Sequence, residues 1–311
     1  MRVRLLDSIL VYHWQAWEDF YISHLVDPSC QIQARYTDDF QHIIRHLGPN
    51  IRAVLFQINL SRADLFPQRR RQMVAMLQRR GLVVLNTEVQ DITKRNLHRM
   101  LKHAGLGSLK AGRSGPAEEM LFLKTNLNFG GMIEQCMTRS LRRIFLPAPP
   151  CPIQGWDEYF AAMRCNVPQA YWSDPSIVIE RYIANPEDSF YRVYGFGDAI
   201  VVVEGRAPQL IKKLLGRRDE PHHLLTRSQL RSRKTALPRD LQGVLKRFIA
   251  HYPLAYFCLD LVHDGQRHYI IDLNLTPYSD PRRQTPEIRA FLARGAERFV
   301  QRAASRLQSR A

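Results

Sequence analysis

The sequence lacks a long apolar run. Although 45% of its 311 residues are hydrophobic, no stretch approaches the roughly 20 uninterrupted apolar residues that a membrane-spanning helix needs. The N-terminal segment begins with positive charge, but Asp7 and His13 interrupt its apolar residues and no small-residue cleavage site follows. We therefore expect a soluble, cytoplasmic protein with neither a membrane span nor a signal peptide.

Cysteine is also scarce, and its spacing excludes two classes of site. The five cysteines are widely separated, and no two of them form a C-x-x-C pair. This spacing indicates neither a disulfide framework nor a zinc site, and it fits a reducing compartment. We interpret the cysteines as small apolar side chains, and the histidine pairs at 222–223 and at 263 and 268 as loop or turn residues.

Acidic residues are few relative to basic ones. The chain has 29 Asp and Glu against 45 Lys and Arg, which gives a formal charge of +16. Such a field attracts anions, including nucleotides, acidic peptides, nucleic acid and membrane surfaces, but does not choose among them. Much of the charge lies in short runs separated by apolar residues at helix-like intervals, which is typical of solvent-exposed helix faces.

The N-terminal part alternates apolar and helix-like segments. Within residues 1–86, strands are predicted at 3–6, 53–58 and 81–86, with an amphipathic helix at about 67–80. Strands separated by helices favour parallel pairing, so this part is expected to form an α/β domain.

The remainder of the chain becomes rich in strands from residue 176 onward. A helix is predicted to end at Gly105, and a polar, basic segment at 216–235 is expected to be a surface loop or a lid. The other predicted elements are strands at 120–124, 177–183, 190–196, 198–204, 256–262 and 268–274, and helices at about 239–250 and from 286. Turns at 197–198 and 264–265 would connect neighbouring strands as hairpins.

The last hairpin carries the most informative group of polar residues. Asp260 lies on its first strand, and Asp272 and Asn274 lie on its second strand. Alternation puts Asp272 and Asn274 on one face of the sheet, and Asp260 can reach the same place. Oxygen ligands of this kind suit a magnesium ion that is also held by phosphate, whereas the alternative is a hairpin with exposed acids.

A lysine and a glycine loop precede this hairpin. Lys124 ends an apolar strand, and the loop after it closes with Gly130 and Gly131. Such a loop can bring backbone N–H groups against phosphate, although it is not a P-loop, because no Gly-Lys-Ser/Thr opens a helix. Further along, Glu180 could accept an adenine amino group, and the main chain of 181–183 could contact the edge of the ring.

The order of these pieces resembles the ATP-grasp superfamily, the group of D-alanine–D-alanine ligase, glutathione synthetase and the peptide-glutamylating ligases. The resemblance covers about residues 85–300, and the Asp-Leu-Asn-Leu-Thr-Pro segment at 272–277 is its most specific part. It implies an α/β protein with the ATP-grasp fold, in which two α+β lobes enclose the nucleotide. The implied units are an N-terminal α/β (pre-ATP-grasp) domain at 1–86, a central lobe at 87–183 and a C-terminal lobe at 184–311.

The resemblance also implies ATP and Mg²⁺ as cofactors. Asp260, Asp272 and Asn274 match the family's magnesium ligands. Lys124, followed by the glycine loop, matches its phosphate-binding lysine, and Lys94 resembles a basic residue that meets phosphate near the start of the grasp domain.

The remaining matches concern adenine, ribose and the reacting phosphate. Glu180, Tyr182 and Ile183 match the linker that holds adenine. Arg192 and Arg206 look like the arginines near the γ-phosphate and the acyl phosphate, which makes them the catalytic candidates. The candidates for the acid that binds ribose are Glu187 and Asp188, and we take Glu187.

The leading hypothesis is an ATP-grasp ligase that joins a carboxylate to an amine or a thiol through an acyl phosphate. The expected substrate is an amino acid or a peptide, and the basic segment 206–234 is a candidate lid that attracts an acidic substrate. One alternative is a nucleic-acid or acidic-partner binding protein with a decayed ATP site, which rests on the +16 charge alone. Another is a phosphotransferase on the same fold. The site residues argue against nucleic acid as the main partner.

Overall fold

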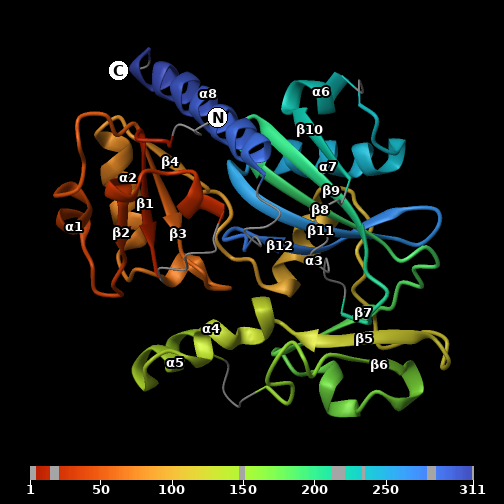
Figure 1. Ribbon diagram of the computed structural model, residues 1–311. Helices are drawn as coiled ribbons and strands as arrows, with labels where there is room; N and C mark the ends of the chain where they lie inside the picture. The colour runs from red at the N-terminus through yellow and green to blue at the C-terminus, as the bar shows by residue number, and fades with distance from the viewer. Residues whose placement is uncertain are drawn as a thin grey trace.

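The described residues of the chain fold around three β-sheets, which Figure 1 shows in one view. The computed structural model describes residues 5–14, 21–146, 151–211, 221–232, 235–278 and 285–309. Within these residues, no helix has both the length and the apolar character that crossing a membrane would require.

The N-terminal sheet has four parallel strands in the order β2-β1-β3-β4. Its strands are β1 (Ile9–His13), β2 (Gln31–Gln33), β3 (Ala53–Gln57) and β4 (Val83–Leu85). Every residue of β3 is buried, as expected for a parallel strand covered on both faces. The predicted parallel pairing is therefore confirmed.

Two short helices accompany this sheet, α1 (Phe40–Ile44) and α2 (Arg70–Arg79). The second confirms the helix predicted at about 67–80, and it buries Met73 and Leu77 one helical turn apart. The strand expected at 3–6 lies partly outside the described residues, and its described part is a single bridge from Leu6 to Val26. The first strand begins three residues later, at Ile9.

A three-stranded antiparallel sheet in the order β6-β5-β7 forms the middle of the chain. Its strands are β5 (Met120–Thr125), β6 (Phe160–Met163) and β7 (Ile177–Arg181), and the short helices α4 (Met132–Gln135) and α5 (Arg139–Phe145) lie between β5 and β6 along the chain. Leu121 and Leu123 alternate into its small core with Ile177 and Ile179.

The largest sheet has five antiparallel strands in the order β10-β9-β8-β11-β12. They are β8 (Ser189–Phe196), β9 (Ala199–Arg206), β10 (His222–Thr226), β11 (Tyr256–His263) and β12 (His268–Asn274). Four of these strands and both hairpin turns were predicted. The expected loop at 216–235 instead contains β10 and the helix α6 (Arg227–Ser232); residues 212–220 and 233–234 lie outside the described residues.

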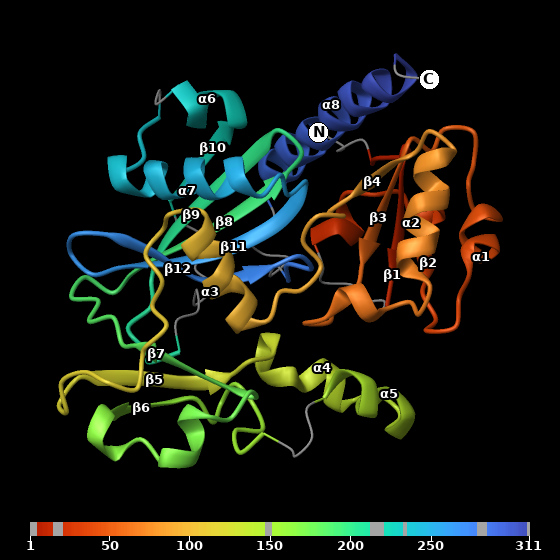
Figure 2. The same ribbon diagram turned by 180° about the vertical axis from the view of Figure 1, so that it is seen from behind.

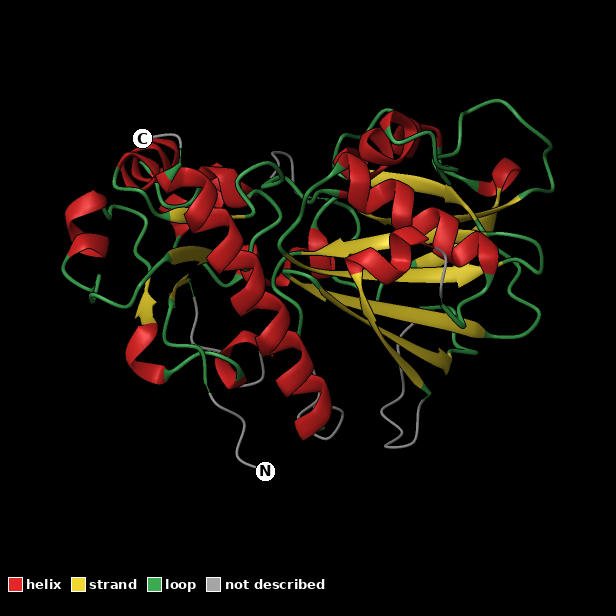
Figure 3. Cartoon of the chain, turned by 90° about the horizontal axis from the view of Figure 1, so that it is seen from above, coloured by secondary structure: helices red, strands yellow, loops and turns green. Residues whose placement is uncertain are grey.

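The two faces of the five-stranded sheet have different neighbours. Helix α7 (Arg239–His251), α6 and α3 (Lys94–His103) share one hydrophobic cluster with it. Helix α8 (Pro286–Gln308) belongs to a second cluster that joins this sheet to the N-terminal sheet, and it lies between the two in the view from above (Figure 3). In Figures 1 and 2, α6 and α7 lie on one side of the five-stranded sheet, and the three-stranded sheet lies on its other side. The boundaries 1–86, 87–183 and 184–311 stay predictions.

Candidate active site

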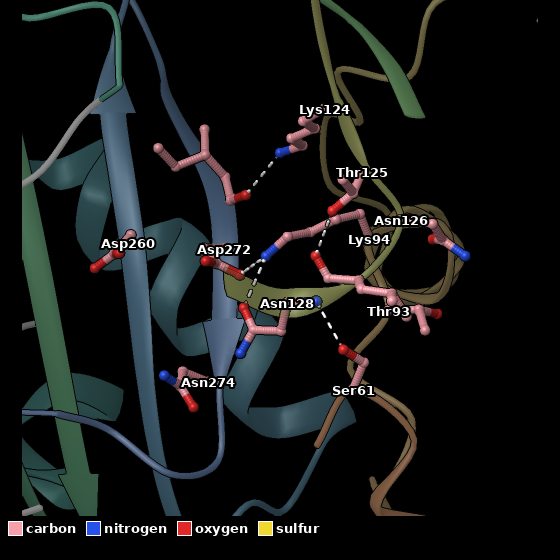
Figure 4. A network of polar contacts seen from close by, with 12 residues as sticks. Ser61, Thr93, Lys94, Lys124, Thr125, Asn126, Asn128, Asp260, Asp272 and Asn274 are labelled. Carbon is pink, nitrogen blue, oxygen red and sulfur yellow. Dashed lines mark hydrogen bonds and ion pairs between the residues drawn. The ribbon is translucent and has the colours of Figure 1, made fainter. Parts of the chain in front are cut away.

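Three oxygen-bearing side chains lie together on β11 and β12, as predicted. Asp260 is directly opposite Asp272, and Cys258 is directly opposite Asn274. Opposed residues on neighbouring strands share a face, and residues two apart on one strand do as well. Asp260, Asp272 and Asn274 therefore occupy one face of the sheet, on the side toward the three-stranded sheet (Figure 4).

An irregularity in β12 separates this group from the rest of the hairpin. Asp260 pairs with Asp272, whereas Leu261 pairs with Ile270, so Ile271 is the extra residue of a β-bulge. Its carbonyl oxygen accepts a hydrogen bond from Lys124 Nζ at 3.3 Å. The bulge thus connects the strand that carries Asp272 to the strand that carries Lys124.

Arg192 pairs with the first carboxylate in a fork geometry. It lies directly opposite Asp260 on β8, and its Nε and one terminal nitrogen each donate to an Asp260 oxygen at 2.7 Å. Burial opposes the charge on Arg192, but the Asp260 carboxylate outweighs it and raises the pKa of the guanidinium above its usual value. Such a bidentate pair fixes both side chains.

Lys94 pairs with the second carboxylate. This lysine is buried at the start of α3, and its ammonium group contacts Asp272 and donates to Asn128 Oδ1 at 3.1 Å (Figure 4). Asn274 has a different partner, since its Oδ1 accepts from the backbone N–H of Thr276 at 2.8 Å. Both carboxylates are therefore neutralised by a cation from another part of the chain.

A buried group of charges lies next to this pair, at the edge of the three-stranded sheet. Glu180 Oε1 is 2.8 Å from Lys124 Nζ and 2.8 Å from His98 Nε2, and each of the three side chains is only about 5% exposed. Burial alone would raise the pKa of Glu180, but Lys124 and His98 together hold it at about 2. The Glu180 carboxyl group is therefore ionised and fixed in position.

The glycine loop after β5 depends on backbone conformations that other residues rarely adopt. Gly130 and Gly131 have φ values of 68° and 76°, and a Cβ atom on Gly130 would lie 2.4 Å from the backbone nitrogen of Trp156. The loop is tied to the segment that follows β3, because the Asn128 N–H donates to Ser61 Oγ at 2.7 Å. Ser61 in turn donates its N–H to the buried Glu134 carboxylate at 2.8 Å.

The linker after β7 follows the edge of the same sheet. The Tyr182 N–H donates to the Met120 carbonyl at 3.0 Å, which fixes this part of the main chain. The side chain of Ile183 packs beside Phe190 and Val262 near the five-stranded sheet. The linker therefore joins the two sheets directly beside Glu180.

Two of the residues expected at the site lie apart from this group. Arg206 is exposed at the end of β9, and alternation from Val203, the partner of Arg192, directs it to the other face of the sheet. Glu187 is exposed in the connection between β7 and β8. The structure does not bring either side chain to the carboxylates.

Two residues of the group were missed by the sequence interpretation, His98 and Asn128. His98 follows Lys94 by four residues, so both lie on one face of α3, and that spacing was a usable signal once Lys94 had been chosen. Asn128 gave no comparable signal, because it meets Lys94 across 34 positions of sequence.

Comparison with known proteins shows similarity in structure rather than in sequence. Neither the protein-family models nor the curated proteins gave a match. A D-alanine–D-alanine ligase from Bacillus anthracis is similar with a TM-score of 0.50 at 11% identity, over 97% of this chain and 99% of that chain.

Two further solved structures are similar over nearly their whole length. The ATP-grasp ligase PsnB, complexed with a phosphomimetic variant of its minimal precursor, Mg and ADP, has a TM-score of 0.49 at 12% identity, over 95% of this chain and 99% of that chain. A Chryseobacterium gregarium RiPP-associated ATP-grasp ligase, in complex with ADP and a leader and core peptide, has a TM-score of 0.49 at 11% identity, over 96% and 97%. Identities this low are informative about the fold alone.

Proposed function

Because the chain has the ATP-grasp fold, we propose that it is an ATP- and magnesium-dependent ligase that joins a carboxylate to an amine or a thiol. We further propose an amino acid or a peptide as the substrate and an acyl phosphate as the intermediate. The observation that carries the proposal is the group of Asp260, Asp272 and Asn274, which faces Lys124 and has Lys94 and Arg192 as its cations.

The oxygen donors of this group fit a magnesium ion. Asp260 and Asp272 would hold it together with Asn274, because carboxylate and amide oxygens are the ligands that hard cations prefer. When bound with ATP, the ion would neutralise phosphate charge. Without nucleotide, Lys94 pairs with Asp272 and Arg192 pairs with Asp260. Both cations can turn to phosphate oxygens when the nucleotide binds.

The nucleotide would lie between the three-stranded and the five-stranded sheets. The printed contacts of Glu180 with Lys124 and His98 both use Oε1, so Oε2 can accept a hydrogen bond from the adenine amino group, while the linker at Tyr182 and Ile183 lies beside the ring. Lys124 and Lys94 would bind phosphate oxygens, and the glycine loop would cover them. The roles predicted for Glu187 and Arg206 require movement from their places here.

The proposed reaction needs positioning and charge neutralisation more than a protein nucleophile. A carboxylate oxygen of the substrate attacks the γ-phosphorus, and the bond to ADP breaks, which gives an acyl phosphate and ADP. An amine then attacks the acyl carbon, phosphate leaves, and the amine loses a proton. Arg192 and Lys94 would stabilise the negative charge on the transferred group in both steps.

Calorimetry with Mg²⁺ and ADP tests the site at moderate salt, which suppresses non-specific anion binding. We expect wild type to bind with an affinity that depends on magnesium, and Asp272→Ala to lose that dependence. The exposed Glu118→Gln variant, which removes the same charge elsewhere, should bind like wild type. Equal magnesium dependence in wild type and Asp272→Ala would refute the assigned metal ligands.

The reaction type needs a separate measurement. We would incubate the enzyme with ATP and a set of carboxylates in hydroxylamine, which converts an acyl phosphate into a hydroxamate. A ligase gives hydroxamate and ADP in equal amounts. A phosphotransferase gives ADP and a stable phosphorylated product, and a binding protein with a decayed site gives neither.

A further inference from the structure

Two histidines and an aspartate meet at the end of the β11–β12 hairpin that points away from Asn274. His263 ends β11 and His268 begins β12, and the two are directly opposite each other. Asp240 lies in the first turn of α7, which packs on this hairpin, as Figures 1 and 2 show. Three elements thus contribute one potential metal ligand each.

This group is separate from the proposed active site. Below the bulge at Ile271, Leu261 and Ile270 face the hydrophobic cluster of α7, and alternation puts His263 on the same face as Leu261. Asp260 and Asp272, above the bulge, face the three-stranded sheet instead. The histidines and the active-site carboxylates therefore lie on opposite faces of one sheet.

The donor atoms are already close together. One ring nitrogen of each histidine and one carboxylate oxygen of Asp240 lie within 4.8 Å of one another. The two imidazole rings have centroids 4.4 Å apart. His268 is fixed by Asp240, whose Oδ2 contacts Nδ1 and accepts the His268 backbone N–H at 3.1 Å. An ion held by all three residues would have to replace the direct contact between Asp240 Oδ2 and His268 Nδ1.

One nitrogen of the group is buried without a hydrogen-bond partner. The His268 side chain is 2% exposed, and its Nε2 has no partner among the described residues. Leaving a buried polar atom unpaired costs about 1–3 kcal/mol, so such an atom calls for an explanation. Because Nδ1 already contacts Asp240, Nε2 is the ring nitrogen of His268 that is not committed to a protein partner, and a metal ion needs an unprotonated ring nitrogen.

We propose that Asp240, His263 and His268 form a second metal site, for a zinc-class transition ion. Two imidazoles and one carboxylate suit Zn²⁺, Co²⁺ or Ni²⁺ better than Mg²⁺, which prefers oxygen ligands. Three protein ligands leave a position for water, and Asp240 is 38% exposed, so an ion can enter. Bound there, the ion clamps α7 to the hairpin that carries Asp260 and Asp272.

Negative charge near the group supports binding in a basic chain. The Tyr191 ring packs against His268 with centroids 4.9 Å apart, and its hydroxyl donates to Glu204 at 3.2 Å. Asp240 and Glu204 thus place two carboxylates around the two histidines. This local balance differs from the overall charge of +16.

The test uses untagged, chelator-treated protein and Zn²⁺ alone, titrated against a chromophoric competitor. We expect wild type to bind one equivalent more tightly than His263→Ala by at least about tenfold, because the variant loses one of three ligands. Co²⁺ in place of Zn²⁺ should give visible absorption typical of tetrahedral coordination, and the variant should lose it. The matched control His222→Ala removes an exposed histidine on β10 and should keep the site.

The outcomes separate a metal site from a structural contact. If wild type and His263→Ala bind zinc alike, or if His222→Ala loses as much affinity, the proposal is wrong and the Asp240–His268 contact is only a tie between α7 and β12. If His263→Ala does not fold, Asp240→Asn, which keeps the shape of the side chain, replaces it. Asp272→Ala should keep zinc binding, so this result does not depend on the proposed ligase activity.

Discussion

Glu180 provides the sharpest test of the charge arrangement, because its carboxyl group is buried and contacts both Lys124 and His98. Its pKa is about 2, against an ordinary value of 4.5. Since one pKa unit corresponds to about 1.36 kcal/mol, ionised Glu180 contributes about 3 kcal/mol to stability at neutral pH. Glu180→Gln removes the charge with little change of shape and leaves Lys124 and His98 without their anion. We therefore expect the variant to be less stable than wild type by about 3 kcal/mol at pH 7.

The pH dependence has a defined direction. The carboxyl group stays ionised down to about pH 2 in the folded protein, whereas it takes up a proton near pH 4.5 in the unfolded chain. Its contribution is therefore fully present above pH 4.5 and is lost as the pH falls from there toward 2. The stability difference between wild type and Glu180→Gln should shrink over that interval.

Urea unfolding at pH 7, 5 and 3.5 measures this difference, with Glu118→Gln as the exposed control. The control should differ from wild type by less than about 0.5 kcal/mol at each pH. A difference below about 1 kcal/mol for Glu180→Gln at pH 7, or one that stays constant from pH 7 to 3.5, would refute the reasoning.

Three further changes test other parts of the site. Lys94→Met should strengthen binding of Mg²⁺ alone, because Asp272 loses its cation, and weaken binding of ADP; calorimetry that shows neither change contradicts the pairing. Arg192→Lys keeps the charge but loses the fork to Asp260, so ADP release should fall at least about tenfold, and an unchanged rate would exclude a role for that geometry. Gly130→Ala should destabilise the fold by about 1–3 kcal/mol in urea unfolding, whereas an effect below about 0.5 kcal/mol would show that the loop adapts.

The sequence predicted best those strands that pair with their neighbours along the chain, because their apolar pattern and turn residues are local signals. Strands β8, β9, β11 and β12 are consecutive in pairs, and the turns at Gly197 and Gly265 have positive φ values that suit glycine. Two of the strands that were missed, β2 and β10, have weak local signals. Gln31–Gln33 is three residues long and largely polar, and β10 begins with two histidines, so each is defined by its neighbouring strand rather than by its own sequence.

The candidate active site also has features that local sequence predicts and features that it does not. Alternation was enough to bring Asp260, Asp272 and Asn274 together, because all three lie on one hairpin. The bulge at Ile271 was not visible in the pattern, since Ile270 and Ile271 are both apolar and either fits a regular strand. Without it, alternation would have put His268 on the same face as Asp272, whereas the structure separates them.

The ion pairs could not be predicted from local sequence, because they join positions as far apart as Lys94 and Asp272, which are separated by 178 residues. Yet one helix accounts for two of them. Lys94 and His98 lie one turn apart on α3, and they reach Asp272 in the five-stranded sheet and Glu180 in the three-stranded sheet. Leu97 and Leu101, each three residues after Lys94 and His98, lie on the same side of α3 and are buried in the cluster with residues of β11 and β12. Since packing there sets the position of both Lys94 and His98, α3 couples the carboxylates of the two sheets. The site therefore depends on the core of the five-stranded sheet as much as on its own side chains.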